Sequence, residues 1–223
     1  MIITIDGPTA SGKSTVANLL AQRLGYTYIN SGLLFRAVAF VLEKENWNLH
    51  DSHIIKKLRH ILGHNEGIIY KYSPYAGAQI WYKSVNITAT LKTPEIDHLA
   101  SVCATDTLLR DLLLAYQQSI AEGHNVIAEG RDTGTVVFPQ AEVKLFITAE
   151  LPIRAQRWQE YQQRKGVSYS LSESEQHVAD RDARDEQRNI APLTVPEHAT
   201  IIDSSSLTIE EVVDACVKVI ERS

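Results

Sequence analysis

A short segment near the start of the chain has the residue types and the spacing that are needed to hold phosphate groups. It fits G-x-x-x-x-G-K-[ST] at every position, reading Gly7, Pro8, Thr9, Ala10, Ser11, Gly12, Lys13 and Ser14. Glycine allows the loop to curl so that successive N–H groups point at phosphate oxygens, and the following helix adds free donors. Lys13 can bridge a β- and a γ-phosphate, Ser14 can bind Mg²⁺ through its hydroxyl, and Thr15 adds an N–H. The segment therefore predicts a bound purine triphosphate, but it does not identify what receives the phosphate.

Two arginine-bearing segments follow predicted strands and are candidates for holding a second anion. Ser31–Arg36 comes directly after the second predicted strand, and Glu129–Gly134 comes after the strand predicted at 125–128. Ligands of an open parallel sheet bind beyond the carboxyl ends of its strands. We therefore expect both segments to flank the phosphate loop.

A third segment, residues 181–188, reads RDARDEQR and lies in a polar, charged stretch. If this segment is helical, an arc of about 100° holds Arg181, Arg184, Asp185 and Arg188. One interpretation is a solvated helix with i,i+4 ion pairs such as that between Arg181 and Asp185. The phosphate loop favours a functional interpretation instead, because phosphoryl transfer spreads negative charge that positioned arginines can neutralise. Such a helix is also suited to close over the donor as a lid and exclude water.

The elements that must position these residues alternate between short apolar runs and helical patterns. Runs suited to strands occur at residues 1–5, 26–29, 126–128, 143–147 and 200–202. Helical spacing marks residues 15–24 and about 33–45, and the last helix opens with a capping box formed by Thr208 and Glu211. The alternation predicts an α/β fold of the P-loop NTPase type, with a parallel sheet covered by helices on both faces.

One stretch, from about residue 67 to residue 92, interrupts this alternation. Two runs of β character, Ile68–Tyr70 and Gln79–Tyr82, flank a turn sequence, which predicts a small β insertion. Its aromatic residues could stack on nucleic-acid bases, but the acidic chain favours a satellite sheet with its own small core. The insertion ends at Thr93 and Pro94, an N-cap followed by proline at the first helical position.

The composition limits the class of protein. The chain has 223 residues, 44% hydrophobic and 22% charged, with a formal net charge of −5, which excludes wholesale disorder and a broad basic surface for nucleic acid. Its two cysteines, Cys103 and Cys216, form neither a zinc motif nor a disulfide framework. No apolar run approaches the roughly 20 residues of a membrane helix. Because the first motif begins at Asp6, we expect no leader sequence and a cytoplasmic location. The acidic net charge and the short apolar runs lead us to expect no nucleic-acid or membrane partner. Since the sequence shows no dimer signal, we expect a monomer.

The sequence resembles the bacterial type of cytidylate kinase, a family of nucleoside monophosphate kinases. The matching stretches run in family order along nearly the whole chain: IDGPTASGKST, INSGLLFRAVA, EGRDTGTVVFP, RDARDEQRNIAPL and IIDSSSLTIEEV. The resemblance implies a P-loop core made of residues 1–30, 104–150 and 192–223. It also implies an acceptor-binding region at 31–103, which includes the β insertion, and a lid at 151–191.

The resemblance also implies roles for individual residues. Lys13, Arg131 and Arg188 would act on the transferred group, and so would Arg157. Arg154 and Arg157 have one-turn spacing at the start of the lid, and one of the two would reach the transferred phosphoryl group. Glu129 would orient Mg²⁺ through water. The acceptor phosphate would be held by Arg36, Arg131 and Arg188, and the ribose by Arg181 and Asp185. Ser31 and Phe35 would also contact the acceptor, and Phe35 stands where the family usually has tyrosine.

Ser101, Arg110 and Asp132 would read the base. A carboxylate such as Asp132 accepts from the 4-amino group of cytosine, and Arg110 donates to N3 and O2. Uracil reverses this pattern, and mispaired buried polar groups discriminate strongly between ligands.

The expected reaction is transfer of the γ-phosphoryl group of ATP, with Mg²⁺, to CMP or dCMP, giving ADP and CDP or dCDP, in pyrimidine nucleotide metabolism. Two alternatives stay open. The chain could be another small-molecule kinase, acting on UMP or shikimate, or a nucleotide-gated regulatory protein that uses the phosphate loop as a switch.

Overall fold

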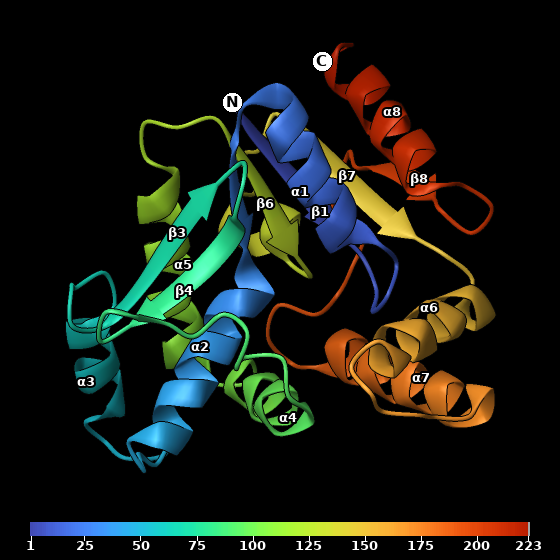
Figure 1. Cartoon of the computed structure of the whole chain (residues 1–223). Helices are drawn as coiled ribbons and strands as arrows, with labels where there is room; N and C mark the ends of the chain where they lie inside the picture. The colour runs from blue at the N-terminus through green and yellow to red at the C-terminus, as the bar shows by residue number, and fades with distance from the viewer. Residues whose placement is uncertain (223) are drawn as a thin grey trace. The chain divides into compact units, whose positions relative to one another are not determined.

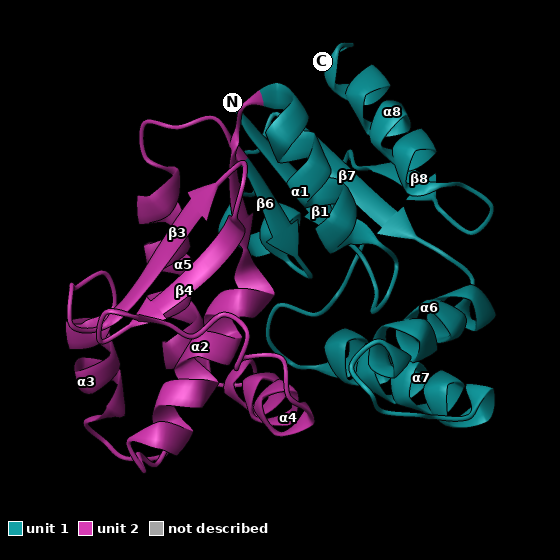
Figure 2. Ribbon diagram, viewed as in Figure 1, with its two compact units in different colours: residues 1–24, 127–223 teal, residues 25–126 magenta. Residues whose placement is uncertain are grey.

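The computed structural model describes residues 1–222 and contains two compact units (Figure 2). One comprises Met1–Leu24 and Ile127–Ser223, and the other comprises Gly25–Val126. Within residues 1–222, no helix combines the length and the apolar character that crossing a membrane requires.

A parallel sheet forms the centre of the first unit (Figure 1). Its strands lie in the order β6-β1-β7-β8, and β7 pairs in parallel with both β1 and β8. Every residue of β1 after Ile2 and every residue of β6 is buried, which explains why these strands read as continuous apolar runs. The bounds are β1 Ile2–Asp6, β6 Val126–Gly130, β7 Val143–Thr148 and β8 Thr200–Asp203. The predicted parallel α/β fold is confirmed.

In the described residues of the first unit, four α-helices and one π-helical turn accompany the sheet. Helix α1 (Lys13–Leu24) follows the phosphate loop and packs against α8 (Ile209–Ile220), whose predicted capping box is present. Helices α6 (Leu151–Gln163) and α7 (Leu171–Gln187) pack on each other, and the π-turn η1 spans Thr133–Val137.

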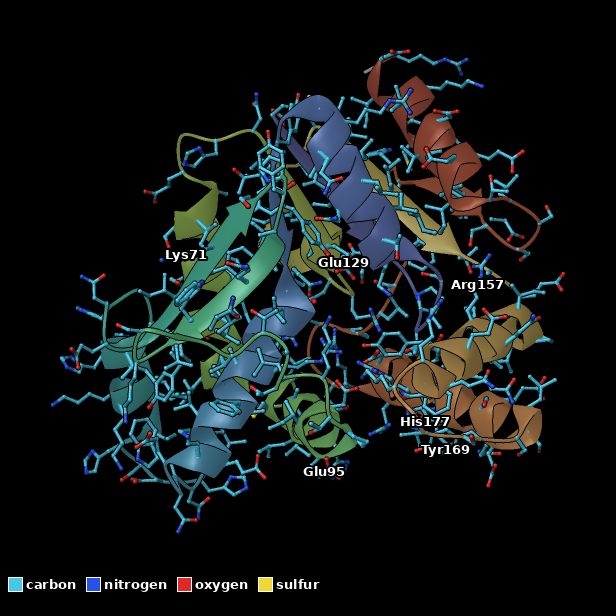
Figure 3. All side chains as sticks on the ribbon, viewed as in Figure 1. Lys71, Glu95, Glu129, Arg157, Tyr169 and His177 are labelled. Carbon is cyan, nitrogen blue, oxygen red and sulfur yellow. The ribbon has the colours of Figure 1, made fainter. Side chains whose placement is uncertain are left out.

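Aromatic rings fill the contact between α6 and α7. The Trp158 ring centroid lies 4.3 Å from that of His177 and 4.9 Å from that of Tyr169, and Figure 3 labels the two partners. A second capping box, Ser170 with Glu173, starts α7. The two helices are therefore joined by their own small apolar contact.

The second unit begins with β2 (Thr27–Asn30) and α2 (Ser31–Lys44), followed by α3 (Ile54–Ile61). An antiparallel sheet of β3 (Ile68–Ser73), β4 (Gly77–Tyr82) and β5 (Val85–Asn86) comes next. Helices α4 (Pro94–Cys103) and α5 (Thr107–Ala121) complete the unit, and Thr93 caps α4 as predicted.

The small sheet does not have a core of its own, contrary to the prediction. Ile68, Tyr70, Ile80 and Tyr82 belong to the same buried cluster as the inner residues of α2, α4 and α5. The Tyr70 hydroxyl also accepts from the Asn30 N–H at 2.9 Å and donates to the Tyr28 carbonyl at 2.8 Å. The small sheet and these helices therefore share one core, because the strands alone are too few to bury their apolar side chains.

Candidate active site

The phosphate loop connects β1 to α1 and requires glycine at its first position. Gly7 has a φ of +153°, and a Cβ there would lie 2.0 Å from the Ile147 carbonyl oxygen on β7. The close approach fixes the start of the loop against the carboxyl end of the sheet. The Lys13 side chain turns back over the loop, where Nζ donates to the Pro8 carbonyl at 2.7 Å.

Burial and the neighbouring Arg131 guanidinium lower the pKa of Lys13 to about 7. The side chain is 4% exposed, so its ammonium has lost most of its hydration. A phosphate placed against Nζ would favour the charged form and raise this pKa again. The loop therefore holds a cation that gains from binding an anion.

Asp6, the last residue of β1, ties the strand to the segment that carries Arg131 and Asp132. Its carboxylate accepts from the Thr133 N–H at 2.9 Å, the Thr133 hydroxyl at 2.8 Å and the Gly134 N–H at 2.8 Å. Burial raises the pKa of Asp6 to about 6 even though these hydrogen bonds lower it. The interpretation from sequence missed this residue, whose only local signal is a carboxylate that ends an apolar strand next to the loop.

Arg131 joins the phosphate loop to α7. Its Nε donates to the Asp185 carboxylate at 2.8 Å, and its Nη2 donates to the Thr9 hydroxyl at 3.3 Å. Burial alone would lower the pKa of Arg131, but the charges of Asp185 and Glu129 outweigh it and raise this pKa. Burial likewise acts to raise the pKa of Asp185, and Arg131 and Arg181 lower it overall. The predicted approach of 129–134 to the phosphate loop is confirmed.

Part of the predicted arginine face of residues 181–188 gathers around Asp185. Helix α7 ends at Gln187 and Arg188 is its C-cap, with a helical φ of −64°, and Nη1 of Arg188 lies 3.9 Å from the Asp185 carboxylate. Its Nη2 lies 3.6 Å from Asp132 and its Nε donates to the Ala191 carbonyl at 2.5 Å. Arg184 is exposed and donates to the Asp180 carbonyl. The charge of Arg181 acts on Lys13 and Asp185, so Arg181 faces the loop side of α7.

A buried ion pair that the sequence did not suggest lies beside Thr9. Arg154 of α6 pairs with Asp182 of α7. Asp182 accepts from the Thr9 N–H at 2.8 Å, and Arg154 donates to the Thr9 carbonyl at 3.1 Å and to the Ala149 carbonyl at 2.8 Å. The sequence marked Arg154 only for its one-turn spacing from Arg157 and did not mark Asp182.

Arg157 occupies a different position. Its guanidinium donates to the Ser204 hydroxyl at 2.9 Å and to the Ser204 carbonyl at 2.6 Å, beyond the end of β8. Figure 3 labels Arg157 on α6. The Ser204 hydroxyl also donates to the Ser11 carbonyl at 3.0 Å, so Arg157 reaches the phosphate loop through Ser204. Its contact with a transferred phosphoryl group stays a prediction.

Two oxygen donors suit the predicted magnesium ion. Ser14 lies in the first turn of α1 with its side chain exposed, and Glu129 lies near the carboxyl end of β6, labelled in Figure 3. Mg²⁺ prefers hard oxygen ligands and keeps several waters when it binds with phosphates. Residues 1–222 contain no group of three or more histidine, cysteine or acidic side chains arranged for a metal. The donor set fits an ion held largely by nucleotide and water.

The remaining predicted residues belong to the second unit. Ser31, Phe35 and Arg36 lie on α2, Ser101 on α4, and Arg110 on α5. The structure brings two of them together, because the Arg110 guanidinium lies 5.5 Å from the Phe35 ring centroid. Arg110 is 7% exposed and donates to the Ala104 carbonyl at 3.0 Å.

Arg36 pairs with a carboxylate on α4. Its Nε lies 2.5 Å from Asp97, and the side chain is 22% exposed. An arginine that is already ordered by one carboxylate keeps its other N–H groups in a fixed plane, which suits recognition of a planar or tetrahedral anion.

Two comparisons of the sequence with known proteins agree on one family. A sequence model described as cytidylate kinase matches residues 3–222. Proteins named cytidylate kinase from Thermotoga neapolitana and Ralstonia nicotianae are each 37% identical to this chain. The alignments cover 99% and 95% of this chain, and 96% and 88% of the two relatives.

Solved structures share the fold at low identity. An uncharacterised protein from Eubacterium ventriosum aligns with 100% of this chain and 99% of its own, with a TM-score of 0.54 and 12% identity. A shikimate kinase from Bacteroides thetaiotaomicron aligns with 99% of this chain and 98% of its own, with a TM-score of 0.50 and 14% identity. These two likenesses describe the fold alone.

Proposed function

The chain belongs to the cytidylate kinase family, and we propose that it transfers the γ-phosphoryl group of ATP to CMP or dCMP. The products are ADP and CDP or dCDP. The observation that carries the proposal is the position of Arg131, which is hydrogen-bonded to both the phosphate loop and α7. A guanidinium held there neutralises charge on a group that leaves the loop. The cytoplasmic location and the monomeric state stay predictions.

Catalysis is proposed to rest on alignment and charge neutralisation. A phosphate oxygen of the acceptor attacks the γ-phosphorus, the bond to the β–γ bridging oxygen breaks, and ADP leaves with that oxygen. The acceptor oxygen is already ionised at neutral pH, so no strong general base is needed. Lys13, Arg131 and Arg188 neutralise the transferred group, and Arg157 is assigned with them. Ser14, and Glu129 through water, would hold Mg²⁺, which would supply further charge neutralisation at the phosphates.

The acceptor residues are assigned from the family's motifs, position by position. We propose that Arg36, Arg131 and Arg188 hold the acceptor phosphate, that Arg181 and Asp185 hold the ribose, and that Ser31 and Phe35 contact the acceptor. Ser101, Arg110 and Asp132 are assigned to the base. The burial of Arg110 supports the base assignment chemically. Arg110 is nearly buried, and a buried guanidinium that loses its ligand acceptors is costly.

The test is to replace Arg110 and to measure kcat/KM for CMP and the dissociation constant for ATP. Arg110→Ala removes donors to N3 and O2, so we expect kcat/KM for CMP to fall roughly a hundredfold. This fall corresponds to a loss of about 3 kcal/mol in transition-state stabilisation. The dissociation constant for ATP should stay the same. The matched control is Arg59→Ala, which removes an exposed arginine from the same unit and should change neither value. A variant that uses CMP as well as the unaltered enzyme does would refute the assignment of Arg110.

A further inference from the structure

We propose that Asp182 is a positioning residue that holds the peptide of Thr9, and with it the phosphate loop, in the conformation that binds ATP. The proposal rests on the proposed function, because it concerns how the same site takes its nucleotide. It assigns Asp182 a role in nucleotide binding without direct contact to the nucleotide.

The backbone N–H and the backbone carbonyl of Thr9 are both held by the same ion pair. Asp182 Oδ1 accepts the Thr9 N–H at 2.8 Å, while its Oδ2 pairs with Arg154. Arg154 Nη1 donates in turn to the Thr9 carbonyl at 3.1 Å, and its Nε donates to the Ala149 carbonyl after β7. The pair therefore closes a ring around one residue of the loop and ties that ring to the sheet.

Burial makes the loss of either partner of this ion pair costly in free energy. Asp182 is 7% exposed and Arg154 is 9% exposed, so neither charge can be solvated if its partner is removed. Removing one member of a buried ion pair leaves the other charge uncompensated. An exposed i,i+4 ion pair on the same helix would contribute much less to stability.

Helix α7 holds Thr9 at a second point as well. Asp185, one turn after Asp182, binds Arg131, and Arg131 donates to the Thr9 hydroxyl at 3.3 Å. The N–H, the carbonyl and the hydroxyl of Thr9 are thus all engaged by α7 or by an arginine that α7 holds. Since Thr9 is the third residue of the phosphate loop, the position of α7 sets the shape of the loop.

The experiment compares Asp182→Asn with Glu186→Gln, which removes an exposed carboxylate from the same helix. Asparagine can still accept the Thr9 N–H, but its amide would face Arg154, donor against donor. We expect the dissociation constant for ATP, measured by calorimetry, to rise roughly tenfold to a hundredfold in Asp182→Asn. The constant for CMP, measured without ATP, should change much less, and Glu186→Gln should match the unaltered protein.

Two further measurements keep the proposal refutable. Arg154→Lys keeps the charge but cannot reach all three partners, so it should also weaken ATP binding. This variant serves as the test if Asp182→Asn does not fold. The Thr9 amide proton, followed by NMR, should exchange faster with solvent in both variants. Unchanged ATP affinity in a folded variant would overturn the proposal, and so would equal losses for ATP and CMP. An unaltered protein that does not bind ATP would refute the proposed function instead, and Thr9 exchange would still test the role of Asp182.

Discussion

Replacing Gly7 by alanine should separate a steric requirement of the phosphate loop from a general effect on stability. A Cβ at this position would lie 2.0 Å from the Ile147 carbonyl oxygen, where real contacts stay above about 3 Å. Either the loop or β7 must therefore move by about 1 Å, and the φ of +153° is one that alanine adopts only with strain. A displacement of about 1 Å at a positioned group can cost roughly a hundredfold.

Gly25→Ala is the matched control. Gly25 also has a positive φ, +69°, but an added Cβ there meets nothing within 4 Å. Its cost should be limited to the backbone penalty of about 1–2 kcal/mol in the free energy of unfolding. Urea unfolding measures the stability of both variants, and calorimetric titration measures their affinity for ATP.

We expect Gly7→Ala to bind ATP at least roughly a hundredfold more weakly, while Gly25→Ala keeps the affinity of the unaltered protein. If both variants lose stability equally and both retain ATP affinity, the close approach of the loop to β7 does not matter for binding. That result would refute the steric account of Gly7.

Three more predictions concern charge and metal. Because the folded state raises the pKa of Asp6 from 3.8 to about 6, it binds a proton that the unfolded chain releases, so stability should fall as pH rises from about 4 to 6; urea midpoints should show this slope, and Asp6→Asn should lack it. Since the pKa of Lys13 is about 7, calorimetry should show ATP affinity weakening between pH 7 and 8 by up to about fivefold, but not in Lys13→Arg. Chelation with EDTA should abolish transfer in a coupled assay, and added Mg²⁺ should restore it.

Local signals were sufficient for several of the elements and for the phosphate loop. Glycine, lysine and serine at fixed spacing define the loop, and the capping box of Thr208 and Glu211 and the N-cap at Thr93 mark helix starts without any distant contact. These features depend on residues within a few positions of one another, so a single sequence contains all the information they need.

The part of the site that depends on distant contacts could not be predicted. Asp182 and Thr9 are 173 residues apart, and nothing local distinguishes Asp182 from the other acidic residues of α7. Arg188 lies beside Asp185 of α7, as the helical pattern predicts, but its approach to Asp132 depends on a distant contact that the pattern does not reveal. The small sheet shares its core with α2 because its own strands bury too little, which alternation within the strands does not reveal.

The central claim is that one phosphoryl group passes from ATP to a cytosine nucleotide. Initial rates with ATP and Mg²⁺ should therefore be measured for CMP, dCMP, UMP, AMP and GMP at equal concentrations, with ADP as the detected product. We predict rapid turnover of CMP or dCMP and little or none of AMP and GMP. Rapid turnover of AMP or GMP, with none of CMP or dCMP, would contradict it.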